Sequence, residues 1–172
     1  YQGKRSVAIT GFMGVGKSSV ARHLANMLGC ERIDLDVVIE KSQKRKIADI
    51  IESDGLDAYR QIESENLARI LENNDCTVLS LGGGTWTVDS NRDLINAHGL
   101  TSIWLESTFE HCWKNIRHSW KERPLARDKN AALKLFEERQ GIYCLADWHF
   151  VVKPEHTSWD IARSIAEELF EL

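Results

Sequence analysis

The stretch Gly11-Phe12-Met13-Gly14-Val15-Gly16-Lys17-Ser18 decides the fold class of this 172-residue chain. It fits the pattern G-x-x-x-x-G-K-[ST], in which glycines let the backbone turn its N–H groups inward around phosphate oxygens. A β-branched apolar run precedes it (residues 6–10) and a helical apolar period follows it (residues 17–28). The pattern therefore predicts a site for the phosphates of a nucleoside triphosphate. The alternative is an ordinary glycine-rich turn, although four fixed positions should match by chance in only roughly 0.5% of chains this long.

Each residue type in this stretch has an expected role. The helix that begins near Lys17 would add the positive end of its dipole to the phosphate site. The Lys17 ammonium would reach the β- and γ-phosphates, and the Ser18 hydroxyl would ligate Mg²⁺. The residues expected to bind the nucleotide phosphates are Gly14, Val15, Gly16, Lys17, Ser18 and Ser19.

Short β-branched runs alternate with longer helical stretches along the rest of the chain. Strands are predicted at residues 6–10, 32–35, 77–81, 101–105 and 149–152, and helices at 17–28, 37–44, 56–71, 109–120, 131–145 and 161–170. Strands separated by helices form parallel βαβ units. We therefore expect an α/β fold, a three-layer αβα sandwich with a five-stranded parallel sheet, as one domain over residues 1–172.

The composition narrows the class of protein further. With 42% hydrophobic residues and 28% charged ones, the chain has enough apolar side chains for a core. Its net charge of −4 argues against nucleic acid as a partner. No apolar run approaches the length of a membrane span. We therefore expect no membrane partner. The four cysteines (Cys30, Cys76, Cys112 and Cys144) are far apart, which predicts buried reduced thiols and a cytoplasmic protein.

Three further features follow predicted strands, where ligands bind in such sheets. Asp34 and Asp36 end the second strand, and alternation of side chains predicts that both carboxylates point the same way, one toward a metal's water shell and one toward a hydroxyl. The alternative is a pair of helix N-capping aspartates. Gly82-Gly83-Gly84 after the third strand indicates close approach to that backbone, unless it is a flexible loop. Arg123, in a charged segment between two helices, is expected on a mobile lid of about residues 119–129, or else is a solvated loop arginine.

The ordered series of these motifs resembles the shikimate kinase family over residues 6–146, most of the chain. The P-loop alone is common to many families, whereas the combination in this order is highly specific. The series consists of the P-loop at 11–18, Ile33-Asp34-Leu35-Asp36, Ile47-Ala48-Asp49-Ile50-Ile51, Tyr59-Arg60-Gln61-Ile62-Glu63, Leu81-Gly82-Gly83-Gly84, Arg123-Pro124-Leu125 and Arg139-Gln140-Gly141-Ile142-Tyr143.

This resemblance implies phosphorylation of the 3-hydroxyl of shikimate by ATP, with Mg²⁺ as the cofactor, in aromatic amino-acid biosynthesis. It implies that Asp36 holds the accepting hydroxyl, that Arg60 and Arg139 clamp the substrate carboxylate, and that the shikimate-binding region spans about residues 34–62. By the same resemblance the backbone of Gly82, Gly83 and Gly84 binds the substrate, and Asp34 supports the Mg²⁺ that Ser18 ligates. Lys17 and Arg123 would stabilise the transferring phosphoryl group.

The residues alone leave purely structural interpretations open. Arg60 could form an i,i+3 salt bridge with Glu63, and Arg139 could be a surface residue. Trp86 could narrow the expected pocket or pack on a neighbouring helix.

The chain also departs from the family pattern. Ala126 replaces the second leucine of R-P-L-L, and the usual adenine-stacking arginine is absent from its position, so Arg117 and Pro154 are the candidates for binding the base.

Two other classes of function compete with this expectation. One is a different small P-loop kinase that phosphorylates gluconate or a nucleoside monophosphate. A nucleoside monophosphate kinase would be expected to carry several lid arginines, and this lid holds only Arg123 and Arg127. The other is a regulatory module without turnover, although such modules typically lose one of the reactive residues that this chain retains. The expectation is a monomer with shikimate and ATP as its ligands.

Overall fold

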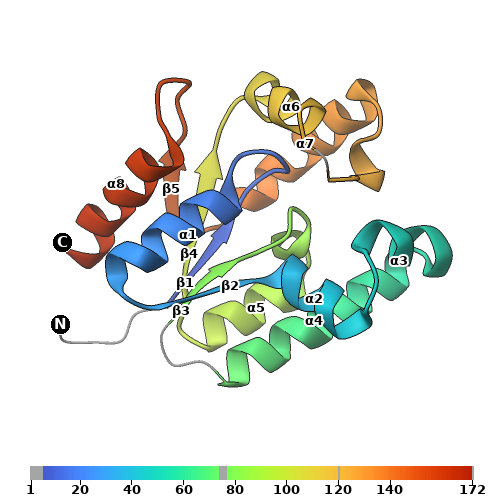
Figure 1. The fold of residues 1–172 in the computed structure, drawn as a ribbon, viewed down its shortest axis with the longest axis horizontal. Helices are drawn as coiled ribbons and strands as arrows, with labels where there is room; N and C mark the ends of the chain where they lie inside the picture. Colours follow the sequence, from blue (N-terminus) through green and yellow to red (C-terminus); the bar gives the residue numbers. More distant parts are fainter. Residues whose placement is uncertain (1–5, 74–76, 120, 172) are drawn as a thin grey trace.

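The computed structural model describes residues 6–73, 77–119 and 121–171, which form three layers (Figure 1). The central layer is a parallel sheet whose spatial order is β2-β3-β1-β4-β5. Its strands are β1 (Val7–Thr10), β2 (Glu31–Asp34), β3 (Thr77–Ser80), β4 (Thr101–Glu106) and β5 (Trp148–Val151). The α/β class and the five-stranded parallel sheet predicted from the sequence are confirmed.

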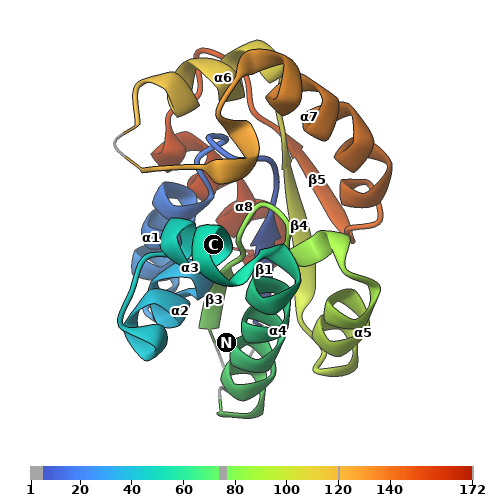
Figure 2. The same ribbon diagram turned by 90° about the vertical axis from the view of Figure 1, so that its right-hand side faces the viewer.

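Helices cover both faces of the sheet. In Figure 1, α8 lies to the left of the strands and α1 crosses in front of them, whereas α4 and α5 lie to the right; Figure 2 views the molecule from that right-hand side. The helices are α1 (Lys17–Leu28), α2 (Leu35–Gln43), α3 (Ile47–Asp54), α4 (Leu56–Asn73), α5 (Asp89–Ala97), α6 (Phe109–Arg117), α7 (Lys129–Tyr143) and α8 (Ser158–Phe170), with 3-10 turns η1 (Thr85–Thr87) and η2 (Pro124–Ala126).

The core lies between the sheet and these helices. Val7, Ala8 and Ile9 of the central strand are fully buried, because both faces of a parallel sheet are covered. Val20 and Leu24 lie four residues apart on α1 and are also fully buried. Each fully buried Val, Ile or Leu side chain contributes roughly 1.5–3 kcal/mol. This packing holds the loops at the carboxyl ends of the strands in place.

The helices differ from the prediction in two respects. Neither α3 nor α5 was predicted, because α3 has only eight residues and α5 is mostly polar, with Ile95 as its one buried apolar side chain. The helix expected to reach residue 120 ends at Arg117, and the one expected at 131–145 spans Lys129–Tyr143.

The prediction that strand alternation aligns Asp34 with Asp36 is wrong. Strand β2 ends at Asp34, and Asp36 belongs to the first turn of α2. Asp34 is the N-cap of that helix: its Oδ1 atom accepts the backbone N–H groups of Asp36 (3.0 Å) and Val37 (3.3 Å). The N-capping interpretation is therefore confirmed for Asp34, and a helical turn rather than a strand orients Asp36.

The cysteines are less uniformly buried than predicted. Cys112 is buried and burial raises the pKa of its thiol to about 11, whereas Cys30 is half-buried and Cys144 is exposed. Cys76 lies outside the described residues. Among the helices of the described residues, none combines the length and the apolar character that crossing a bilayer requires.

Candidate active site

The loop between β1 and α1 is shaped by glycines that no other residue could replace without strain. Gly14 has φ 81°, and a Cβ atom there would lie 2.6 Å from the carbonyl oxygen of Cys112. Gly16 has φ 106° and directly precedes α1. The backbone therefore curls tightly at the amino end of the helix, which is the arrangement that presents N–H groups to phosphate oxygens.

The ammonium group of Lys17 folds back onto this loop. Its Nζ atom donates to the carbonyl oxygens of Gly11 (2.8 Å) and Phe12 (3.0 Å). Burial, reinforced by the nearby positive charge of Arg123, lowers the pKa of Lys17 to about 7. An anion in the loop would favour the charged form, so the site is electrostatically suited to phosphate.

Ser18 and Asp34, the two residues predicted to serve Mg²⁺, are in contact. The Ser18 hydroxyl donates to Oδ2 of Asp34 at 2.7 Å, while Oδ1 of the same carboxylate caps α2. A hydroxyl and a carboxylate oxygen are the hard donors that Mg²⁺ takes, and this ion usually keeps several waters and binds through one or two protein oxygens plus substrate phosphates. These residues therefore fit Mg²⁺ bound together with a nucleotide.

The first of two neighbouring cavities, about 490 Å³, lies over the loop and the amino end of α1. The six predicted phosphate-binding residues, Gly14 to Ser19, all line it, as does Arg123. We call it the nucleotide cavity.

Among the residues that the structure describes, those lining the nucleotide cavity do not include Arg117 or Pro154, both of which are exposed. His111 and Asn115 line this cavity from one face of α6, and Arg117, two residues beyond Asn115, lies on another face of the helix. Beyond Pro154, the side of the cavity is formed by residues 156–158. The structure therefore does not bring the two predicted base-binding residues to this cavity.

The second cavity, about 550 Å³, lies between α2, α3 and the segment that carries Arg123. All six residues predicted to bind the acceptor line it: Asp36, Arg60, Gly82, Gly83, Gly84 and Arg139. We call it the acceptor cavity. Apolar side chains that also line it include Met13, Ile47, Ala48, Ile51 and Tyr59.

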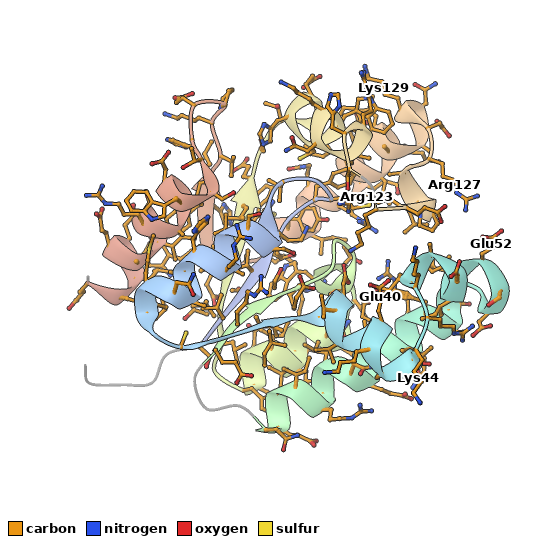
Figure 3. All side chains as sticks on the ribbon, viewed as in Figure 1. Glu40, Lys44, Glu52, Arg123, Arg127 and Lys129 are labelled. Carbon is orange, nitrogen blue, oxygen red and sulfur yellow. The ribbon has the colours of Figure 1, made fainter. Side chains whose placement is uncertain are left out.

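The two cavities share one wall. Six residues line both of them: Asp34, Asp36, Gly82, Gly83, Lys121 and Arg123. In Figure 3, the Arg123 side chain extends from its segment, in the upper half of the view, toward helices α2 and α3 below, on the side where Glu40 is labelled. A group bound in one cavity would therefore meet a group bound in the other at carboxylates, glycine backbone and two cationic side chains.

Two guanidinium groups lie against the backbone of Gly82, Gly83 and Gly84, which we call the glycine loop. A Cβ atom on Gly83 would be 3.3 Å from Nη1 of Arg139, and one on Gly84 would collide with the guanidinium of Arg60. Arg139 is only 6% exposed, so the alternative of a surface arginine is wrong. Arg60 does form the i,i+3 pair with Glu63, at 2.8 Å, and it lines the acceptor cavity as well.

Two buried polar atoms at the shared wall lack a hydrogen-bond partner within the described part of the chain. They are Oδ1 of Asp36 and Nε of Arg123. Burial lowers the pKa of Arg123, and the negative charge of Asp36 opposes this effect. Because buried polar atoms are nearly always paired, these two are the atoms that a ligand at the junction would satisfy.

Sequence reasoning missed several lining residues. Lys121 was visible only as one charge in a charged segment, although it lines both cavities. Asn115 donates to the carbonyl oxygen of Gly14 at 2.7 Å, which ties α6 to the phosphate-binding loop.

Trp86 packs on a neighbouring helix, as the alternative interpretation of this residue expected. It is 1% exposed and its Nε1 atom donates to the carbonyl oxygen of Ile142, so it packs against α7.

Comparison with known proteins identifies what the chain resembles. The family model described as Shikimate kinase matches residues 13–170. The shikimate kinase of Ruegeria pomeroyi is 40% identical over 146 residues, which are 83% of this chain and 73% of the relative. A structure described as shikimate kinase from Acinetobacter baumannii in complex with shikimate has a TM-score of 0.89 at 26% identity and covers 97% of this chain and 93% of its own. Shikimate kinase from Aquifex aeolicus has a TM-score of 0.81 at 30% identity and covers 96% of each chain.

Proposed function

The chain belongs to the shikimate kinase family of ATP-dependent kinases, and we propose that it transfers the γ-phosphoryl group of ATP to the 3-hydroxyl of shikimate, giving shikimate 3-phosphate and ADP. The observation that carries the proposal is the wall shared by the two cavities, with Asp36 on it between the phosphate-binding loop and the two arginines. This arrangement supports a direct transfer from a donor in one cavity to an acceptor in the other.

At the nucleotide end, the loop residues 14–19 would hold the phosphates of ATP through backbone N–H groups and the Lys17 ammonium. Ser18 would ligate Mg²⁺, and Asp34 would support it through water. Bound Mg²⁺ would neutralise phosphate charge there. Arg123 would place its guanidinium, whose Nε atom lacks a partner among the described residues, beside the transferring group.

At the acceptor end, a small anionic polyol needs guanidinium groups for its carboxylate and carboxylate or backbone partners for its hydroxyls. Arg60 and Arg139 would supply the first, and the Gly82–Gly84 backbone the second. Asp36 would accept the hydrogen bond of the reacting hydroxyl. The Ile47, Ala48 and Ile51 side chains would contact the ring, within the region of residues 34–62 expected to bind it.

In the reaction, the 3-hydroxyl oxygen forms a bond to the γ-phosphorus while the bond from this phosphorus to the β–γ bridging oxygen breaks. The hydroxyl proton passes to Asp36, and ADP leaves with the bridging oxygen. The transition state is loose, so positioning and positive charge from Lys17 and Arg123 provide most of the stabilisation. The lid of residues 119–129 would exclude water, which would otherwise accept the phosphoryl group. The proposal includes action as a monomer in the cytoplasm, without a membrane or nucleic-acid partner.

The variant Asp36→Asn tests the proposal. It keeps the shape of the side chain but removes the carboxylate, so we expect kcat to fall by about 10²–10⁴-fold. The dissociation constant of ATP should stay within about twofold, because Asp36 is assigned to the acceptor. Asp93→Asn, an exposed carboxylate on α5, is the matched control and should keep wild-type kinetics. Wild-type kcat in Asp36→Asn would refute the role of Asp36.

A further inference from the structure

Lys121 contacts the carboxylate that the proposed function places at the acceptor hydroxyl. Its Nζ atom donates to Oδ2 of Asp36 at 2.8 Å, across the wall that the two cavities share. We propose that Lys121 is a positioning residue for phosphoryl transfer: from the lid segment, it holds Asp36 in the orientation that receives the acceptor hydroxyl. This inference rests on the proposed function and adds a residue to it.

The two carboxylate oxygens of Asp36 have different environments. Oδ2 is held by Lys121, whereas Oδ1 is buried and has no hydrogen-bond partner among the described residues. Oδ1 lies against the glycine loop, since a Cβ atom on Gly82 would be 2.8 Å from it. Rotation of the Asp36 side chain would break the bond to Lys121. The ammonium therefore favours the rotamer in which Oδ1 is left for a hydroxyl donor beside the glycine backbone.

The positive charge of Lys121 has a second effect. An ionised carboxylate close to a triphosphate repels it, and a cation in contact with the carboxylate offsets that repulsion. Lys121 and Arg123 are two residues apart on the same segment, and both line both cavities. When this segment places Arg123 at the junction of the two cavities, it also places Lys121 against Asp36. The position of the lid is therefore linked to the orientation of the Asp36 carboxylate.

The contact matters for orientation more than for stability. The Lys121 side chain is 44% exposed and that of Asp36 is 22% exposed. Pairs of this kind stabilise a folded protein only weakly, because solvent screens them. Removing the lysine should therefore leave the protein folded and alter the rate.

The test compares Lys121→Met with Lys121→Arg in full kinetics with ATP and shikimate. We expect Lys121→Met to lower kcat by about tenfold while changing the KM for shikimate by less than about threefold. Lys121→Arg, which keeps a cation able to bond Oδ2, should stay within about threefold of the wild-type kcat. Lys134→Met is the matched control: it removes the same charge from an exposed position on α7, outside the lid segment and outside both cavities. A Lys121→Met enzyme with wild-type or higher kcat overturns the inference.

A double-mutant cycle shows whether Lys121 acts through Asp36. In the Asp36→Asn background, adding Lys121→Met should change the residual kcat by less than about twofold, because the partner is already gone. The full tenfold loss in that background would mean that Lys121 acts on another group, and it would also overturn the inference. Failure of the proposed function is distinguishable, since the wild type and Lys134→Met would then also be inactive toward shikimate.

Discussion

The guanidinium of Arg60 is held by the carboxylate of Glu63, which is fully buried one helical turn away. Nη1 of Arg60 donates to Oε1 of Glu63 at 2.8 Å, and Oε2 accepts the hydroxyls of Thr85 (2.8 Å) and Tyr59 (3.2 Å). The carboxylate thus joins helix α4 to the turn that follows the glycine loop. The salt bridge of Arg60 is therefore compatible with its proposed role in the acceptor cavity. The bond to Glu63 fixes the arginine beside that cavity.

The variant Glu63→Gln should therefore affect both stability and binding. It removes the anion that pairs with Arg60 and buries an amide N–H₂ group in its place. We expect the free energy of unfolding to fall by about 1–3 kcal/mol and the KM for shikimate to rise by about tenfold. Chemical denaturation and steady-state kinetics measure the two effects. Glu65→Gln, which affects only an exposed bond to Gln61, is the control, and equal behaviour of the two variants would contradict this assignment.

Gly84→Ala should displace Arg60 without unfolding the protein. Gly84 has φ −103°, which alanine tolerates, but its methyl group would collide with the far end of the flexible Arg60 side chain. Because the guanidinium can move aside, we expect a change in the free energy of unfolding below about 1 kcal/mol. The KM for shikimate should rise by about tenfold or more, as measured by initial rates at saturating ATP.

Gly141→Ala is the control for this substitution. Gly141 lies within α7, and a Cβ atom there would meet nothing within 4 Å. Alanine should stabilise the helix by about 0.5–1 kcal/mol and leave the KM unchanged. If Gly84→Ala matched Gly141→Ala in KM, the proposed role of Arg60 in binding shikimate would be wrong.

The low pKa of Lys17 gives a stability difference that depends on pH. The pKa of Lys17 is about 7 in the folded, ligand-free protein and about 10.4 in an unfolded chain. Between these values the unfolded state binds more protons, so the free energy of unfolding contributed by Lys17 rises with pH. The cost of burying its charge is complete below pH 7 and decreases above it. Lys17→Met lacks this cost at every pH.

We therefore expect the stability of the wild type relative to Lys17→Met to be lowest at pH 6 and to increase between pH 7 and pH 9. Urea denaturation of both ligand-free proteins at a series of pH values measures this difference. A difference that stays constant from pH 6 to pH 9 would mean that the pKa of Lys17 is not lowered.

Local patterns in the sequence were sufficient for the sheet and the phosphate-binding loop. The central strand β1 is an apolar run because it is buried on both faces. The phosphate-binding loop is marked by three glycines within six residues, Gly11, Gly14 and Gly16, all of which have positive φ. The helix α5 escaped prediction because its sequence is mostly polar and its place is set by packing of Ile95.

Long-range contacts were harder to predict. The contact between Lys121 and Asp36 joins two segments that no local period relates. The local sequence around Arg139 left a surface position beside Glu137 and Glu138 open, and only the family resemblance placed it at the substrate. In the structure it lies on the same face of α7 as the buried residues Ala132 and Tyr143. That seven- and four-residue spacing is a signal that could have placed it inside. The position of Arg117 relative to His111 and Asn115 follows from the same helical geometry.

The most direct measurement is ADP release by the purified protein with ATP and Mg²⁺, compared across shikimate, quinate, gluconate and AMP as acceptors. We expect ADP to form in a 1:1 ratio with phosphorylated shikimate, and the values of kcat/KM for gluconate and AMP to be lower by at least about 10³-fold. Gluconate is an open chain without the ring that Ile47, Ala48 and Ile51 would contact, and AMP has no carboxylate for Arg60 and Arg139. ADP release with gluconate or AMP but none with shikimate would contradict the account, as would binding of shikimate without any turnover.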